Sequence, residues 1–128
     1  MPFMRVSYME NQYTERDLPI ISQCIMSALI EQFNIPEKDF FQVFHAHKPS
    51  EFYYNPDYLN IARTDRLLYI QITCGSDRSR DQKSKLYKSL ATLLSTECGI
   101  REEDVFIVLV ETEAEDWSFG NGVAQMIG

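Results

Sequence analysis

The sequence predicts an α+β fold in which two similar β-α-β halves build one four-stranded mixed sheet with two helices on one face. Three observations support this prediction. The 128 residues suffice for a single domain, a nine-residue segment recurs in the second half, and a strand pattern followed by a helical pattern precedes each copy. We therefore expect one domain, residues 1-128, made of halves at about 2-64 and 67-128.

The composition indicates a folded chain that does not bind polyanions. Hydrophobic residues make up 45% and charged residues 24%, with only five Gly and five Pro, which excludes low-complexity and disordered classes. The formal net charge of -7 disfavours nucleic acid as a partner. No apolar run approaches the roughly 18 to 20 residues of a membrane span, and the first residues lack a secretory pattern, so we expect a cytoplasmic protein without a membrane partner.

The repeat aligns Ile35–Val43 with Ile100–Val108 at an offset of 65 residues, and five of the nine positions are identical. Upstream of the first copy, Met4, Val6 and Tyr8 alternate with polar residues, as in a half-buried strand. The matching strand carries Leu68, Ile70 and Ile72, which requires an offset of 64 or 66 because a one-residue shift exchanges the faces of a strand.

A helix is predicted between each strand and the repeated segment. The first runs from about Glu15 to Phe33, with Pro19 near its first turn, where proline is tolerated. Its apolar stripe consists of Leu18, Ile21, Ile25 and Leu29.

The second helix is expected from about Arg80 to Cys98. Ser79 and Gln82 have the spacing of a capping box, and Gly99 is a C-terminal stop signal. The inner face is formed by Leu86, Leu90, Leu93 and Leu94. A helix between neighbouring strands implies parallel pairing with a right-handed crossover.

The last strand, Val105–Val110, is apolar on both faces. Because two helices cover only one face of a four-stranded sheet, another surface must cover the other face. Self-association is the simplest solution, and we expect an oligomer.

Pro2 is a candidate catalytic group because removal of Met1 would leave a secondary amine at the chain start. An α-amino group has a pKa of roughly 7.7 to 8.0, and apolar surroundings lower it further, so a neutral base would exist near pH 7. The alternative is a proline that merely begins a strand. If Met1 is retained, the Pro2 nitrogen is an amide without basicity. The position that corresponds to Pro2 in the second half lies inside the chain and has no free amine, so at most one such site exists per chain.

Arg78 and Arg80 lie where the chain enters the second helix, a position that favours anions and allows bidentate binding of a carboxylate. The alternative is that both are solvated and pair with neighbouring aspartates. Asp39 is a candidate polar group, although its repeat partner Asp104 allows a shared turn or cap instead.

The remaining signals are weaker. His45 and His47 share a face of a predicted strand, but two ligands without a third do not predict a metal, and we expect none. Trp117 and Phe119 suit either a pocket mouth or an oligomer seam. The following Gly120-Asn121-Gly122 lacks the context of a phosphate loop and is interpreted as a turn.

These residues resemble the tautomerase superfamily, and within it the malonate semialdehyde decarboxylase-like group. The resemblance is carried by Pro2, Pro36-Glu37-Lys38-Asp39 with Gln42, His47-Lys48-Pro49-Ser50-Glu51, Arg78-Ser79-Arg80-Asp81-Gln82-Lys83, and Glu111 through Asp116-Trp117-Ser118-Phe119-Gly120. It implies a homotrimer of duplicated β-α-β subunits that needs no cofactor. By position, Pro2 would be the catalytic acid or base and Asp39 its polar partner. Arg78 would bind the substrate carboxylate, and Trp117 with Phe119 would form the apolar wall.

One position departs from the resemblance. The decarboxylases have a second arginine where this chain has Ser76, and Arg80 is not an assured substitute. The leading hypothesis is therefore a cofactor-free tautomerase that moves a proton between carbon and the enol oxygen of small 2-oxo acids. The alternatives are decarboxylation of a 3-oxo acid such as malonate semialdehyde, or a non-catalytic trimeric module if Met1 is retained.

Overall fold

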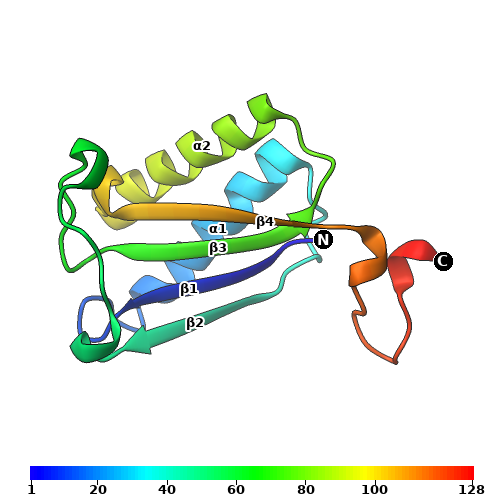
Figure 1. Ribbon diagram of the computed structural model, residues 1–128, viewed down its shortest axis with the longest axis horizontal. Coiled ribbons are helices and arrows are strands. Elements are labelled where there is room, and N and C mark those ends of the chain that lie inside the picture. Colours follow the sequence, from blue (N-terminus) through cyan, green and yellow to red (C-terminus); the bar gives the residue numbers. More distant parts are fainter.

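The computed structural model describes residues 1–128 and contains two helices packed on one four-stranded sheet (Figure 1). The main elements in chain order are β1 (Phe3–Met9), α1 (Asp17–Phe33), β2 (Gln42–His47), β3 (Leu68–Gly75), α2 (Arg80–Cys98) and β4 (Val105–Thr112). Short 3-10 turns occupy the connections and the C-terminal segment. No helix combines the length and apolarity needed to cross a bilayer.

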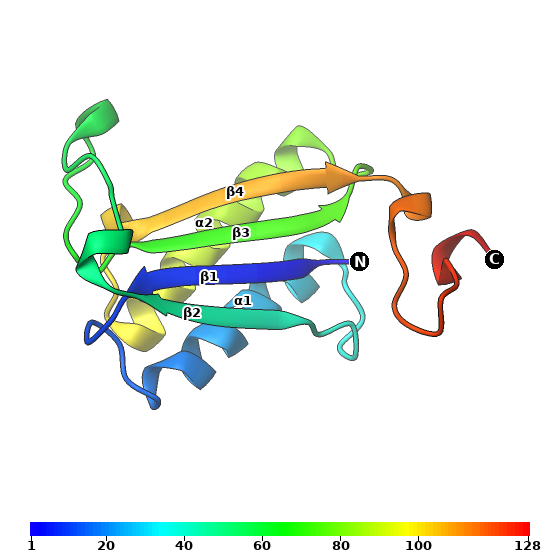
Figure 2. The ribbon, with the colours of Figure 1, turned by 60° about the horizontal axis from the view of Figure 1, so that its bottom comes forward.

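The sheet has the strand order β2-β1-β3-β4. β1 pairs with β2 in parallel, β3 pairs with β4 in parallel, and the central pair β1 and β3 is antiparallel. Both helices cover the same face, as Figure 2 shows with the strands in front of them. The α+β prediction of a mixed sheet with two helices on one face is confirmed.

The helix ends follow from local sequence. α2 begins after Ser79, whose hydroxyl accepts the Gln82 N–H at 3.1 Å while the Gln82 side chain accepts the Ser79 N–H at 2.9 Å. Gly99 ends α2 with φ of 66°, a conformation that costs glycine little. The predicted bounds of α2 are confirmed.

α1 begins two residues later than the expected Glu15. The Thr14 N–H donates to the Asp17 carboxylate at 2.8 Å and the Thr14 carbonyl accepts the Asp17 N–H at 2.9 Å, so Glu15 and Arg16 form a turn that leads into the helix, in which Arg16 already has helical φ and ψ of -78° and -34°. At the other end Asn34 adopts φ of 55°, the position that Gly99 occupies in the second half. The repeat therefore extends to the helix C-caps.

The register explains the imperfect offset. Met4 pairs with Gln42 and Ile70 pairs with Ile107, so the first strands of the two halves lie 66 residues apart and the second strands 65. One residue is therefore missing from the second half between its first strand and the end of its helix.

The core lies between the sheet and the helices. Its fully buried side chains come from alternate strand positions and from the inner helix stripes: Met4, Ile21, Ile25, Leu29, Leu68, Ile70, Ile72, Leu86, Leu90 and Leu94. The opposite sheet face is open. On it Phe106, Val108 and Val110 of β4 remain 43%, 44% and 40% exposed, as the apolar sequence of this strand led us to expect.

Candidate functional site

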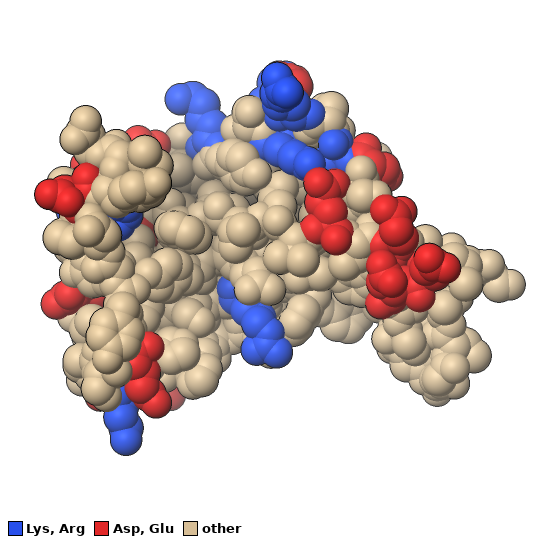
Figure 3. Space-filling view, viewed as in Figure 1, with Lys and Arg blue, Asp and Glu red and all other residues tan.

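One end of the sheet gathers the residues that the sequence singled out. The amino end of β1, the start of β2 and the carboxyl ends of β3 and β4 meet there, and the C-terminal segment leaves from the same end (Figures 1 and 2). Acidic side chains cluster where β4 leaves the sheet (Figure 3). This end holds Pro2, Asp39, Arg78, Trp117 and Phe119.

Asp39 lies in the turn before β2 and faces the chain start. Its Oδ2 accepts a hydrogen bond from the Met1 ammonium at 2.7 Å, in an ion pair whose side chains are 19% and 16% exposed. Its other oxygen, Oδ1, is buried and has no hydrogen-bond partner in the protein. Asp39 thus places a negative charge and a free acceptor beside the first residues.

Pro2 is buried directly before β1. Met1 extends from it across the end of β3, because a Cβ added to Gly75 would lie 3.0 Å from the Met1 methyl carbon and 3.4 Å from Arg78 Nη1. The Met1 side chain and the Arg78 guanidinium therefore lie side by side, and the absence of a side chain at Gly75 leaves room for both.

Arg78 is held over the end of α1. Its guanidinium lies 5.0 Å from the centroid of the Phe33 ring, and Nη2 donates to the Phe33 carbonyl at 3.4 Å. Nη1 pairs with Asp77 at 2.5 Å, and the Arg78 side chain is only 13% exposed. These contacts direct the guanidinium toward the chain start.

The two neighbours of Arg78 are placed differently. Arg80 is exposed in the first turn of α2 and forms neither an ion pair nor a side-chain hydrogen bond. The Ser76 hydroxyl donates to Glu113 Oε1 at 2.9 Å. The structure thus places Arg78, and not Arg80, beside the chain start.

Trp117 and Phe119 stack on each other with ring centroids 5.6 Å apart. The Trp117 indole donates to the Thr112 hydroxyl at 2.6 Å, which fixes it to the end of β4. Phe119 lies 5.8 Å from Phe41, at the start of β2. Because β1 lies between these strands, the aromatic pair spans the sheet end near Pro2.

Positive charge gathers around the end of β3. Burial raises the pKa of the Cys74 thiol, while Arg78, Lys83 and the N-terminal ammonium act in the opposite direction. Lys83 forms an ion pair with Glu111 at 2.9 Å, and this hydrogen bond raises the Lys83 pKa. The site therefore combines several cations with the carboxylate of Asp39, while Asp77 and Glu111 are paired with Arg78 and Lys83.

Asp104, the repeat partner of Asp39, has a different role. It is 1% exposed, and its two oxygens accept the Thr64 N–H and the Thr64 hydroxyl, each at 2.7 Å. Asp104 is thus satisfied by its own chain and secures the segment before β3. A common turn accounts for the position of both aspartates but not for the contacts of Asp39.

The histidines lie outside this site. His45 and His47 stack at 4.0 Å between ring centroids on the open sheet face. No group of three His, Cys, Asp or Glu side chains is arranged to hold a metal ion. The Gly120-Asn121-Gly122 segment is a turn with positive φ at all three residues, as the sequence indicated.

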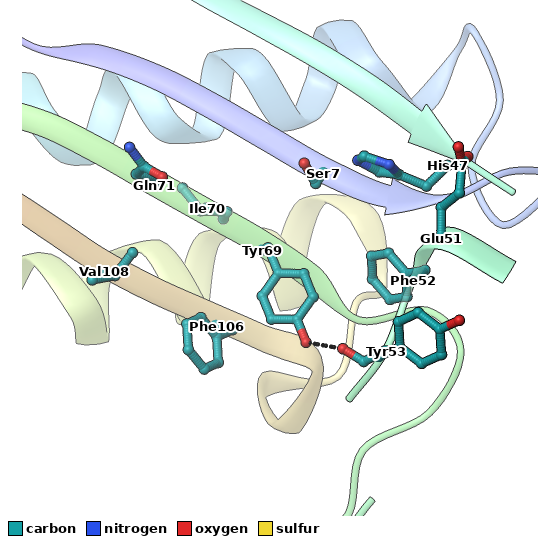
Figure 4. Close-up of a pocket in the computed structure, with 10 residues that line it drawn as sticks. All are labelled: Ser7, His47, Glu51, Phe52, Tyr53, Tyr69, Ile70, Gln71, Phe106 and Val108. Carbon is teal, nitrogen blue, oxygen red and sulfur yellow. Dashed lines mark hydrogen bonds between the residues drawn. The ribbon is translucent and has the colours of Figure 1, made fainter. Parts of the chain in front are cut away.

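A separate cavity of about 440 Å³ lies on the open sheet face, at the end of the strands opposite to Pro2. Figure 4 shows Tyr69, Phe106 and Phe52 along its wall, with His47 and Ser7 at one side. It contains none of the predicted site residues. At the Pro2 end, Met1 itself fills the space between Asp39 and Arg78.

Sequence reasoning assigned no role to Phe33, Phe41 or Lys83, which contact Arg78, Phe119 and Glu111 respectively. Lys83 had a local signal, because it lies in the first turn of α2 after Ser79. In the sequence, Phe33 and Phe41 cannot be told from ordinary core or turn residues. Their contacts follow only from the packing of the two halves.

Comparison with known proteins identifies the family. Residues 39–120 match the family described as "Tautomerase enzyme". The chain is 46% identical over 127 residues to "Probable tautomerase YusQ" of Bacillus subtilis (strain 168), which covers 99% of both chains. The chain belongs to the tautomerase family. "Probable tautomerase YrdN" of the same organism is 32% identical and covers 99% of this chain and 97% of its own length.

Solved structures agree with this family. A malonate semialdehyde decarboxylase, described with decarboxylase and hydratase activities, superposes with a TM-score of 0.91 at 27% identity, covering 98% of this chain and 95% of its own. A fused 4-OT trimer has the same fold, with a TM-score of 0.79 at 16% identity and 98% of both chains covered. The tautomerase chain is therefore an enzyme, and its predicted resemblance to the tautomerase superfamily is confirmed.

Proposed function

We propose that this tautomerase catalyses keto-enol proton transfer on small 2-oxo acids, with Pro2 as the catalytic amine once Met1 has been removed. The observation that carries the proposal is the placement of the chain start between the Asp39 carboxylate and the Arg78 guanidinium. The enzyme would act in the cytoplasm and need no cofactor, because each proposed step is a proton transfer.

The reaction is a 1,3-proton shift. Neutral Pro2 takes the proton from the enol hydroxyl, and the oxygen electrons form the carbonyl. The electron pair of the carbon-carbon double bond then takes the proton from Pro2, which returns to its neutral form. Arg78 holds the carboxylate with parallel hydrogen bonds and stabilises charge that develops on the adjacent oxygen.

Asp39 supports this role of Pro2 in two ways. Its Oδ2 would accept a hydrogen bond from the amine of the trimmed chain, as it does from Met1 here. Its buried Oδ1 remains open as an acceptor for the substrate hydroxyl or for water. Trp117 and Phe119 would form the apolar wall, where they exclude water from the amine and favour its neutral form.

Met1 must leave for this chemistry. Its ammonium occupies Asp39 and its methyl group reaches the Arg78 guanidinium beside Gly75, so the retained residue fills the space that a substrate needs. It also keeps the Pro2 nitrogen in a peptide bond. Intact-mass measurement on protein from the native host determines whether the residue has been removed.

We also propose a homotrimer. The open sheet face with its half-exposed Phe106, Val108 and Val110 requires cover, and a fold neighbour is described as a symmetric trimer. Sedimentation equilibrium on the purified protein measures the number of subunits.

The deciding experiment follows ketonisation of an arylpyruvate enol by ultraviolet absorbance. Replacement Pro2→Ala keeps a terminal amine but changes its basicity and position, and we expect the rate to fall roughly a hundredfold because the general base is no longer matched to the substrate. A second protein, with an N-terminal extension that retains the Pro2 peptide bond, should lose the same activity. An unchanged rate in the alanine variant contradicts the proposal.

Decarboxylation of a 3-oxo acid is the second candidate, favoured by the superposition on malonate semialdehyde decarboxylase. Here protonated Pro2 would polarise the carbonyl while the bond to the departing carbon dioxide breaks. Ser76 stands where the decarboxylases have their second arginine, and its hydroxyl donates to Glu113. This replacement argues against decarboxylation. Carbon dioxide release from malonate semialdehyde decides the matter, and a rate at background eliminates this candidate.

A further inference from the structure

We infer that Thr112 is a positioning residue that sets the distance between the Trp117 indole and the arginine loop after β3, and that it thereby favours 2-oxo acids that carry a flat aromatic group. The inference rests on the proposed function, because it concerns the spacing of the proposed wall and the proposed anchor. Thr112 acts through Trp117 and does not itself touch the substrate.

A turn after β4 brings the indole back to the end of this strand. Thr112 is the last residue of β4, and the chain then folds into a 3-10 turn. In this turn the Glu113 N–H donates to the Asp116 carboxylate at 2.8 Å, and the Asp116 N–H donates to the Glu113 carbonyl at 3.0 Å. The turn therefore returns Trp117 to the side chain of Thr112.

One hydroxyl links this turn to the neighbouring strand. The Thr112 hydroxyl accepts the Trp117 indole N–H at 2.6 Å and donates to the Cys74 carbonyl at 2.9 Å. β3 and β4 end side by side at this point, where Gly75 pairs with Thr112 in the parallel register (Figure 2). Both hydrogen bonds are partly buried, so water competes weakly for the three groups.

The bridge needs a group that both donates and accepts. An indole N–H can only donate and a backbone carbonyl can only accept, whereas a hydroxyl carries one donor and free lone pairs. The branched Cβ of threonine also restricts χ1 and so limits the directions that the hydroxyl can take. The proton of the Thr112 hydroxyl is therefore directed to Cys74, and a lone pair faces the indole.

The same bridge relates the aromatic wall to the anion anchor. Cys74 is followed directly by Gly75, the last residue of β3, and Arg78 lies three residues further along the chain. The indole and the guanidinium are thus both held near the end of β3. The distance between them is set by Thr112 and not by the exposed turn after β4.

The shape of the wall indicates which substrates depend on this distance. The rings of Trp117 and Phe119 are nearly parallel, with an angle of 14° between their planes. A flat apolar surface offers a large contact area to another flat ring and little to a short alkyl chain. An arylpyruvate bound through its carboxylate at Arg78 should therefore depend on the position of Trp117 more than a short aliphatic 2-oxo acid does.

Nuclear magnetic resonance of the isotope-labelled full-length protein tests the position of the indole. Trp117 is the only tryptophan, so the protein gives one indole N–H resonance. Thr112→Val keeps the shape of the side chain but cannot accept, and we expect the resonance to shift and its exchange with deuterium oxide to become roughly tenfold faster. Thr112→Ser restores the hydroxyl and should resemble the wild type.

Two outcomes of this measurement overturn the inference: an unchanged indole resonance in Thr112→Val, or a Thr112→Ser protein that differs from the wild type as much as Thr112→Val does. Thr92→Val is the matched control, because Thr92 is an exposed threonine of α2. It should leave the indole resonance as it is in the wild type.

Deuterium exchange beside the keto group of two acids tests the consequence for the site. The methionine-trimmed enzyme is given phenylpyruvate or 2-oxobutanoate in deuterium oxide. Thr112→Val should raise KM for phenylpyruvate roughly fivefold or more and change KM for 2-oxobutanoate less than about twofold. Thr112→Ser should restore both values. A general structural defect affects the two acids alike, so equal effects contradict the inference.

A double-mutant cycle shows whether Thr112 acts through Trp117. Trp117→Phe keeps an aromatic ring but removes the indole N–H, so adding Thr112→Val should change KM for phenylpyruvate little further. Independent, additive effects of the two replacements contradict the inference. If even the wild type exchanges neither acid, the proposed function fails, while the indole resonance still decides whether Thr112 positions Trp117.

Discussion

Arg78 and Arg80 illustrate how two like residues in one motif acquire different surroundings. Arg78 is nearly buried against the Phe33 ring and points toward the chain start, whereas Arg80 is solvated on α2. Stacking on an aromatic ring and a fixed planar fork are properties that lysine does not reproduce. The chemical role proposed for the motif therefore belongs to one of its two arginines.

Replacement Arg78→Lys should raise KM for an arylpyruvate roughly tenfold or more, because the parallel hydrogen bonds to the carboxylate are lost. Arg80→Lys is the matched control and should change KM less than about twofold, in line with its exposed position. Steady-state kinetics on both variants measure the difference. Equal effects at the two positions would contradict the assignment of Arg78.

At the scale of elements, the turns before β2 and β4 are copies with different uses. Both carry an aspartate at the same point of the repeat, but Asp104 binds Thr64 of its own chain and Asp39 faces the chain start. The turn before β4 thus stabilises the fold, whereas the turn before β2 keeps a carboxylate acceptor that the proposed chemistry can use.

The two aspartates should respond in opposite ways to alanine. Asp104→Ala leaves the part-buried Thr64 N–H and hydroxyl without an acceptor, which costs about 1–3 kcal/mol and lowers Tm. Asp39→Ala should leave Tm nearly unchanged and lower kcat/KM roughly tenfold or more, because the amine loses its polar partner. Thermal unfolding and the enol assay, run on both variants, give the comparison. A large fall in Tm for Asp39→Ala would assign that residue to the fold instead.

Local signals explain why α2 was predicted to the residue. Its capping box and its glycine stop are read from neighbouring positions, and no distant contact is needed. The start of α1 differs from the expected Glu15 by two residues because Glu15 and Arg16 lie in a turn, closed by the bond from the Asp17 N–H to the Thr14 carbonyl, before the regular helix begins. The stripes of leucine and isoleucine residues correctly predicted which faces of the helices form the core of both halves.

The site could be predicted only as a set of residue types. Nothing in the sequence indicates that the Phe33 carbonyl receives Arg78, or that Phe119 crosses the sheet end to Phe41. These contacts join residues far apart in the chain, and they exist because the antiparallel pairing of β1 with β3 brings the two halves together.

At the scale of the whole molecule, buried groups that are neutral in the fold set its response to alkali. Burial raises the pKa of Cys24 from 9.0 to about 12, with Cys98 and Glu97 contributing, and it raises the pKa of Tyr13. The folded chain therefore retains protons that the unfolded chain releases above about pH 9. The contribution of these groups to the free energy of unfolding is fully present below about pH 9 and is lost as pH rises toward 12.

Thermal unfolding between pH 8 and 10.5 should show this decline in Tm. Cys24→Ala removes one of the titrating groups, so its Tm should fall less steeply with pH even if it begins lower because a small cavity remains. A wild-type Tm that stays constant to pH 10.5 would contradict the assignment of these groups to the neutral form.

Each half of the chain contributes different groups to the candidate site. The proposed amine and its carboxylate come from residues before β1 and β2, while the proposed anion anchor and aromatic wall follow β3 and β4. A protein with one half per chain would need two chains to assemble the same set of groups. Here the connection through residues 48–67 links them covalently at a one-to-one ratio, so dilution or subunit exchange cannot separate the proposed acid-base groups from the proposed anchor.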